Sequence, residues 1–185
     1  FVVTDGYVKI NQKAVTVKAD NKSKTYGQSD PTLTATVTGT LGSDTVTYSL
    51  SRASGSNVGT YTITPSGTAS QGNYSVSFST GTFTINKAAA SALGLSVSGG
   101  TYTYNGTARS VSASVSVTSG TTIQYSTNNS SWSTTKPTYT NVGTNTTYVR
   151  AVNSNYDTAT ANANIVINKA AASALGLSVS GYSAL

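Results

Sequence analysis

The side chains that usually carry out catalysis or bind metals are scarce in this chain of 185 residues, which has no His, Cys or Met. Its five acidic residues are all Asp. Zinc, haem and iron–sulfur sites draw on Cys and His ligands, a disulfide needs paired Cys, and nucleophilic catalysis usually places a His beside Ser or Cys. The composition therefore predicts a protein that is not an enzyme, with no catalytic residues, no metal and no other cofactor.

The aromatic residues around the only Trp form one candidate ligand site. Trp132 lies between Tyr125 and Tyr139 in the sequence. An exposed aromatic face can stack on a sugar ring, so these three residues are a candidate glycan contact. A large ring also supplies much of the buried area of a small domain, and buried aromatic residues normally belong to the core. The sequence favours the core role.

A calcium site built from Asp20, Asp30 and Asp44 is a second candidate. Calcium takes about six to eight oxygen ligands, usually with several carboxylates close together. These acids are well separated in the sequence. Asp30, which precedes Pro31, and Asp44 are better explained as turn residues.

A covalent bond between a lysine and an asparagine would be another way to stabilise a domain without cysteine. Such a bond needs a buried Lys beside an Asn and an acid, and Lys13 or Lys18 with Asn73 or Asn86 are candidates. The spacing selects no such set. An intact mass lacking one ammonia per bond would reveal it.

The surface is predicted to consist largely of hydroxyl groups, because Ser and Thr make up about a third of the chain and charged residues only 9%. The net charge of +6 comes from basic residues scattered along the sequence, without a nucleic-acid-binding motif. No run approaches ~18 apolar residues, so no membrane insertion is expected. The start lacks the features of a signal peptide, which makes the chain an interior fragment if its parent is exported.

A long internal repeat organises the chain. The segment 85–99 returns unchanged at 167–181. Weaker echoes join Asn57-Val58-Gly59-Thr60 to Asn141-Val142-Gly143-Thr144, and Thr25-Tyr26-Gly27 to Thr103-Tyr104-Asn105-Gly106. Such a repeat indicates tandem units. We expect the end of a preceding repeat at 1–12, a first domain at 13–87, a second at 88–169 and the start of a following repeat at 170–185.

Each unit alternates apolar and polar residues with period 2, which is typical of half-buried strands. Gly and Asn between the runs suit turns. The pattern predicts two tandem small antiparallel β-sandwich (Ig-like) domains in an elongated array, with β-grasp-like units as the alternative. The Ala-rich segments 87–92 and 169–174 are expected to be junctions, extended or briefly helical. Strands are expected at 15–19, 33–37, 46–50, 61–63, 74–78, 83–85, 111–117, 123–125, 148–152 and 165–167.

The first unit resembles the MBG repeat of the YGX type over about residues 13–87. The ordered landmarks are Lys24-Thr25-Tyr26-Gly27, Asp30-Pro31, Gly42-Ser43-Asp44, Asn57-Val58-Gly59-Thr60-Tyr61, Gly72-Asn73-Tyr74 and Gly81-Thr82-Phe83-Thr84-Ile85. The second unit is similar to bacterial immunoglobulin-like repeats with a "YSTDG…W…YVRA" pattern, but Asn128-Asn129 stands where Asp-Gly is common. That departure removes a carboxylate from the loop.

The resemblance implies non-catalytic structural stalk or spacer repeats of a large bacterial cell-surface or secreted adhesin, hence an extracellular location. Neighbouring repeats of the same chain are the expected partners. Host glycans or mucin are candidate partners for a binding module, which is one alternative; an Ig-like accessory domain of a phage, virion or secreted enzyme is another. Edge strands with few charges also permit lateral self-association.

Overall fold

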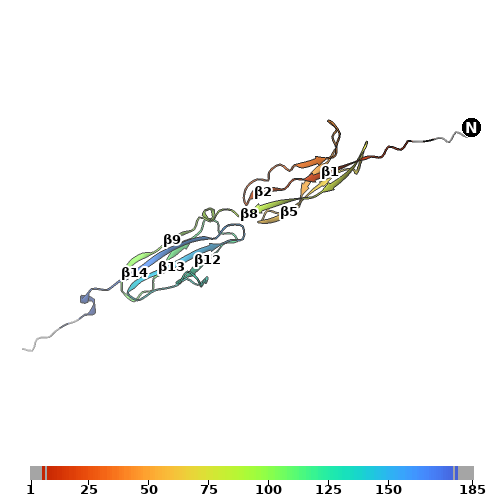
Figure 1. The fold of residues 1–185 in the computed structure, drawn as a ribbon. Helices are drawn as coiled ribbons and strands as arrows, with labels where there is room; N and C mark the ends of the chain where they lie inside the picture. Colours follow the sequence, from red (N-terminus) through yellow and green to blue (C-terminus); the bar gives the residue numbers. More distant parts are fainter. Residues whose placement is uncertain (1–5, 7, 177, 179–185) are drawn as a thin grey trace, which may run out of the picture. The chain divides into compact units, whose positions relative to one another are not determined.

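The computed structural model describes residues 6, 8–176 and 178. The chain divides into two compact units, Phe1–Ala88 and Ala89–Leu185, which are described separately (Figure 1). Parts of the expected end repeats, residues 1–5, 7, 177 and 179–185, lie outside the described residues.

The first unit consists of two four-stranded sheets, with strand orders β3-β1-β7-β6 and β2-β8-β5-β4. Hairpin-type pairs such as β4 with β5 and β5 with β8 are antiparallel. The strands are β1 (Lys13–Ala19), β2 (Lys22–Thr25), β3 (Ala35–Thr38), β4 (Ser49–Arg52), β5 (Gly59–Ser66), β6 (Ser70–Gln71), β7 (Tyr74–Ser79) and β8 (Gly81–Asn86).

The sheets are mixed rather than wholly antiparallel as expected. Strand β1 runs parallel to β7, and β2 runs parallel to β8. The alternation of side chains is the same in parallel and antiparallel strands, so the sequence pattern does not distinguish them. Parallel pairing arises here because the first and last segments of the unit lie side by side and run in the same direction.

Two adjoining apolar clusters form the core of the first unit. One gathers the inward residues of β1 and β7, and the other those of β5 and β8. Strand β5 also contacts β1, which brings the two sheets together. The buried residues of the two clusters are Val15, Val17, Tyr74 and Val76, then Ala19, Ile63, Phe83 and Ile85.

The second unit repeats the plan of one of these sheets. Its four-stranded sheet has the order β10-β14-β13-β12, with β10 parallel to β14, as β2 is to β8. A two-stranded sheet of β9 and β11 accompanies it. The strands are β9 (Ser96–Ser98), β10 (Gly100–Thr103), β11 (Ser112–Ser114), β12 (Thr122–Ser126), β13 (Gly143–Val152) and β14 (Ala159–Asn168).

The echoes in sequence occupy matching places in the two units. Gly59 opens β5 opposite Ile85, and Gly143 opens β13 opposite Ile167. The backbone NH groups that follow β2 and β10, those of Tyr26 and Tyr104, donate to the carbonyls at the ends of β8 and β14, each at 2.8 Å. The weak repeat in sequence therefore marks a shared architecture.

The junction segments are briefly helical, as the alanine-rich sequence indicates. Each forms a short 3-10 helix, η1 (Ala90–Leu93) and η2 (Ala172–Leu175), ended by a glycine in the left-handed conformation. Leu93 of η1 is completely buried in the second unit, in a cluster with Ala151 and Ala159. The first junction is thus an integral part of the second unit.

Several strands differ from the expected ranges. Strand β2 escaped prediction because Lys22-Ser23-Lys24-Thr25 has no apolar alternation; its place depends on pairing with β8. The expected strand 111–117 is reduced to β11, since the NH of Ser116 bonds instead to the carbonyl of Leu93. Gly81, expected in a turn, opens β8, where a Cβ would lie 2.6 Å from the Ala19 carbonyl oxygen.

The all-β class and sandwich architecture agree with expectation. Among the described residues the only helical segments are the two 3-10 turns, so that part of the chain has no α-helix packed across a sheet, as a β-grasp unit would require. Within the same residues no helix is long and apolar enough to cross a membrane.

Candidate functional site

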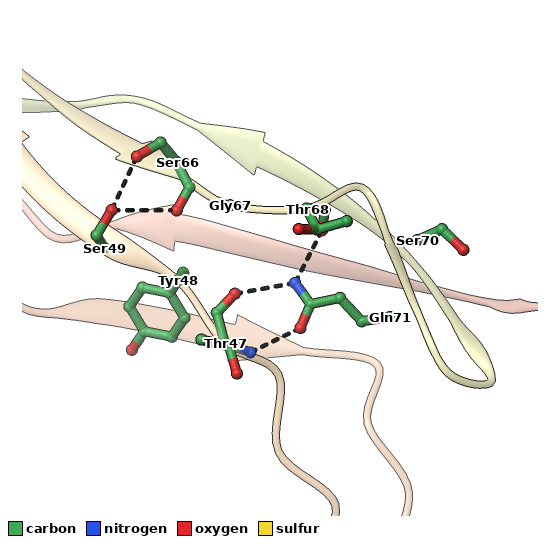
Figure 2. Close-up of a pocket in the computed structure, with 8 residues that line it drawn as sticks. All are labelled: Thr47, Tyr48, Ser49, Ser66, Gly67, Thr68, Ser70 and Gln71. Carbon is green, nitrogen blue, oxygen red and sulfur yellow. Dashed lines mark hydrogen bonds between the residues drawn. The ribbon is translucent and has the colours of Figure 1, made fainter.

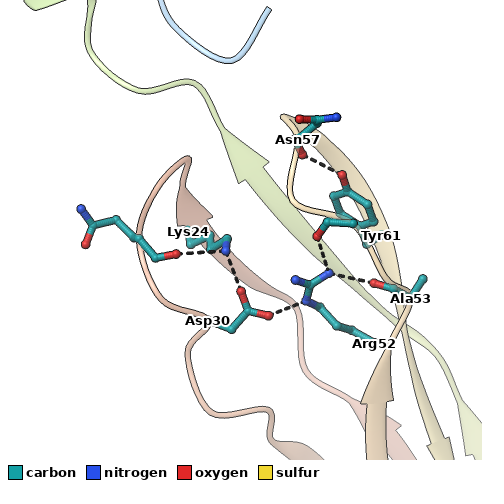
Figure 3. A network of polar contacts seen from close by, with 8 residues as sticks. Lys24, Asp30, Arg52, Ala53, Asn57 and Tyr61 are labelled. Atoms are coloured by element: carbon teal, nitrogen blue, oxygen red, sulfur yellow. Dashed lines mark hydrogen bonds and ion pairs between the residues drawn. The ribbon is translucent and has the colours of Figure 1, made fainter. Parts of the chain in front are cut away.

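An ion-pair network in the first unit joins three segments that are distant in sequence (Figure 3). The Asp30 carboxylate accepts from Lys24 Nζ at 2.7 Å and from Arg52 Nε at 2.5 Å. Lys24 belongs to β2, Arg52 ends β4, and Asp30 lies in the loop between β2 and β3. The network ties this loop to both edges of the sheet β2-β8-β5-β4.

The two cations change the acid–base behaviour of Asp30. The hydrogen bond from Arg52, followed by that from Lys24, lowers the pKa of Asp30 from 3.8 to about 2. The carboxylate is therefore ionised throughout the physiological range. A general acid or base needs a pKa near the working pH, so this carboxylate is suited to structure rather than to proton transfer.

Arg52 also packs against aromatic rings. Its guanidinium lies 4.7 Å from the centre of the Phe83 ring and 5.4 Å from that of Tyr61. It donates to the carbonyls of Ala53 at 2.8 Å and Gly55 at 3.0 Å. An arginine held by both stacking and hydrogen bonds is rigid, so the network braces the core of this sheet.

The other two acids of the calcium candidate lie in separate environments. Asp20 accepts from the hydroxyls of Thr34 at 2.5 Å and Thr36 at 2.8 Å, and these bonds lower its pKa. Asp44 accepts from the Tyr74 hydroxyl at 2.6 Å, which raises the pKa of that tyrosine. Among the described residues no three carboxylate or other metal-binding side chains are grouped.

A shallow cavity of about 440 Å³ lies on the first unit (Figure 2). Gln71 spans its floor: its amide accepts from the Thr47 NH at 2.7 Å and donates to the carbonyls of Thr47 and Thr68. The hydroxyls of Ser49 and Ser66 are 2.9 Å apart. These groups bind one another and include no charged side chain. The lining residues are Thr47, Tyr48, Ser49, Ser66, Gly67, Thr68, Ser70 and Gln71.

The structure does not place the three rings of the glycan candidate on one face. Trp132 is half-buried, and the guanidinium of Arg150 lies 4.5 Å from the centre of its ring. Tyr125 and Tyr139 pack instead against the core cluster of Val111, and the Tyr139 hydroxyl lies 2.9 Å from that of Thr147. A sugar would find one ring here, with a cation on it.

The residues of the cross-link candidate lie at the surface. Lys13 is exposed, and its ammonium group donates to the Gly39 carbonyl at 2.6 Å. Its backbone NH donates to the carbonyl of Asn73 at 2.8 Å. Lys18, Asn73 and Asn86 are also exposed. A cross-link between these residues stays a prediction for intact-mass measurement.

Sequence reasoning missed the role of Arg52. The signal that could have found it is the scarcity of charge: with so few ionic side chains in the chain, a motif such as Lys24-Thr25-Tyr26-Gly27 followed closely by Asp30 stands out. The partner Arg52 lies much further along the chain. Only the pairing of β4 with β5, and of β5 with β8, brings it beside Phe83.

Comparison with solved structures finds distant similarity only. One match is protocadherin gamma B7 extracellular cadherin domains 1-4, with 10% identity and a TM-score of 0.31, covering 87% of this chain and 52% of that chain. Another is titin domains I67-I69, an E-to-A variant, with 10% identity and a TM-score of 0.27, covering 83% and 64%. The chain thus spans less than two thirds of either. A search of curated proteins finds no match.

The family comparison concerns the first unit. The model of the MBG domain (YGX type) matches residues 15–84. The match runs from β1 to β8 and includes the Lys24, Asp30 and Arg52 network, so several landmarks of the sequence meet in one structural brace. The first unit therefore carries an MBG domain of the YGX type.

Proposed function

We propose that the chain is a non-catalytic spacer in the stalk of a bacterial cell-surface or secreted adhesin. Its units would hold a distal binding domain away from the envelope, with neighbouring repeats as their partners. The MBG domain of the first unit and the tandem all-β organisation support this proposal. A surface rich in hydroxyl groups suits the task, because its hydration depends little on charge and hence on salt.

The observation that carries the proposal is the junction repeated without change. Its first copy delivers Leu93, 0% exposed, into the core of the second unit. The second copy forms the same 3-10 helix, but there Leu175 is 84% exposed. A leucine that is a core residue in one copy suits a further unit of the same kind after the other. Linear repeat proteins are built in this way, with each unit contacting only its neighbours.

Small-angle X-ray scattering of the chain tests the proposal. A compact protein of this length would have a radius of gyration of about 16 Å. A spacer should give a value well above that, with a distance distribution extended toward long distances. A compact profile would refute the spacer function.

Glycan binding is the competing function, and the structure provides little that favours it. The Trp132 ring is partly covered by Arg150, and the two tyrosines pack against the core. A glycan array of the chain, with Trp132→Ala as the control, separates the two functions. Reproducible signal that is lost in the variant would favour binding.

A further inference from the structure

The first and last segments of the first unit form one long parallel ladder. Strand β1 pairs with β7 over six residue pairs, and β2 pairs with β8 over four. The same offset in sequence relates Lys18 to Ser79 in one ladder and Lys22 to Phe83 in the other. The register therefore continues through the point where both segments change sheets. At about 3.3 Å per residue, the ladder is about 40 Å long.

The ladder determines how a pulling force would act on the unit. The chain enters at Lys13, at one end of the ladder, and leaves at Asn86, at the other end. Tension applied to the two ends would slide the paired segments past each other along their length. All rungs would then resist together. Pulling on two ends that lie at the same side would instead open the rungs one after another.

We propose that the parallel ladder makes each unit a load-bearing element, a function that rests on the proposed role as a spacer between two attachments. An individual hydrogen bond contributes only about 1 kcal/mol net in water. Rungs loaded together must break within the same small displacement, whereas rungs loaded in sequence break singly. Forced unfolding is governed by the unfolding rate, so the geometry of loading sets the resistance.

Contacts across the change of sheet join the two ladders. The side-chain oxygen of Asn21 accepts from the Thr82 NH at 2.8 Å, between the last rung of β1 and the first of β2. The hydroxyls of Thr16 and Ser77 lie 3.1 Å apart across the β1/β7 ladder. The close approach of Gly81 to Ala19 keeps the segments adjacent at the bend. These contacts allow load to pass from one ladder to the other.

The second unit has a shorter version of the same device. Strand β10 pairs in parallel with β14 over four residue pairs, Gly100–Thr103 with Ile165–Asn168. Its preceding strand, β9, pairs with β11 and not with the last strand. Because its parallel ladder has fewer rungs than that of the first unit, the second unit should yield at lower force and extend first.

Single-molecule pulling through pairs of introduced cysteines tests the proposal, because the chain has no cysteine of its own. The pair Asn11→Cys and Lys87→Cys loads the ladder of the first unit along its length. The pair Asn11→Cys and Asn73→Cys pulls from one end, next to the rung of Lys13 with Tyr74. All these positions are exposed in the full chain. We expect a several-fold higher rupture force for the first pair.

Lys87→Cys with Lys169→Cys loads the second unit and should give a lower force than the first pair. Two variants separate mechanical from general stability. Asn21→Ala should lower the force along the ladder, whereas Gln71→Ala, which removes three hydrogen bonds away from the ladder, should lower the melting temperature with less effect on that force.

Equal forces along the ladder and from one end would overturn the proposal, as would a second unit as strong as the first. Each pair loads one unit, so the result does not depend on the shape of the whole chain. A compact scattering profile would refute the spacer function and leave the pulling result intact, so the two failures can be told apart.

Discussion

Replacing Leu93 with alanine tests whether the junction is part of the folded second unit. Leu93 is completely buried and lies among small side chains, with Ala151 and Ala159 in its cluster. The carbonyl of Leu93 also accepts from the NH groups of Ser116 and Val117. The substitution Leu93→Ala shortens the side chain and leaves these backbone bonds available.

The expected cost follows from the carbons removed. Three buried carbons at about 0.8 kcal/mol each amount to about 2.4 kcal/mol of lost transfer free energy. The cavity that remains adds to this, and Leu→Ala changes in cores cost about 2–5 kcal/mol in total. We expect a loss of about 3 kcal/mol, within that range. A domain with the usual stability of about 5–15 kcal/mol would remain folded.

The only Trp of the chain provides the assay. Trp132 lies in the second unit beneath Arg150, so its fluorescence reports the unfolding of that unit alone. With a slope of about 1 kcal/mol per molar urea for a small domain, Leu93→Ala should lower the midpoint by about 3 M.

The matched control is Leu175→Ala in the identical junction sequence. Local helix propensity is the same in both copies, but Leu175 is 84% exposed. Its substitution should change the stability by less than about 0.5 kcal/mol. Equal effects of the two substitutions would show that Leu93 contributes only local propensity and would refute the argument that the junction completes the core.

Three further predictions concern single residues. Because the pKa of Asp30 is depressed to about 2, its stabilising contribution is present above about pH 4 and is lost as the pH falls toward 2; circular dichroism melts should show this loss, and Asp30→Asn should show less of it. Gly99→Ala would place a Cβ 1.9 Å from the Asn164 carbonyl oxygen, so it should destabilise the second unit by roughly 2–4 kcal/mol; an unchanged midpoint of Trp132 fluorescence would contradict that contact. If the spacer function holds, Trp132→Ala should leave a glycan array unchanged, and signal lost in the variant would reverse that conclusion.

The candidate sites show how far residue types and spacing reach. The sequence argued against a clustered calcium site because the acids are far apart, and the structure gives Asp20, Asp30 and Asp44 separate partners. The proximity of Lys24 and Asp30 is local and could be suspected from the motif. The contribution of Arg52 could not, because it depends on strand pairing between segments that are distant in the sequence.

The sequence by itself determined the class of the fold and the tandem organisation. Alternation with period 2 requires strands with one buried face, and a stretch that returns unchanged, 85–99 at 167–181, requires a repeated structural role. The absence of His and Cys, with only five acids, equally limited the chemistry open to the chain.

Only the tertiary structure decided which strands run parallel and which leucine is buried. Parallel and antiparallel strands share the same alternation of side chains, so the ladder from β1 and β2 to β7 and β8 has no signature in the pattern. The two junctions have the same sequence, yet Leu93 enters a core and Leu175 does not. Burial depends on the neighbours that the fold supplies, and an identical segment can meet different neighbours.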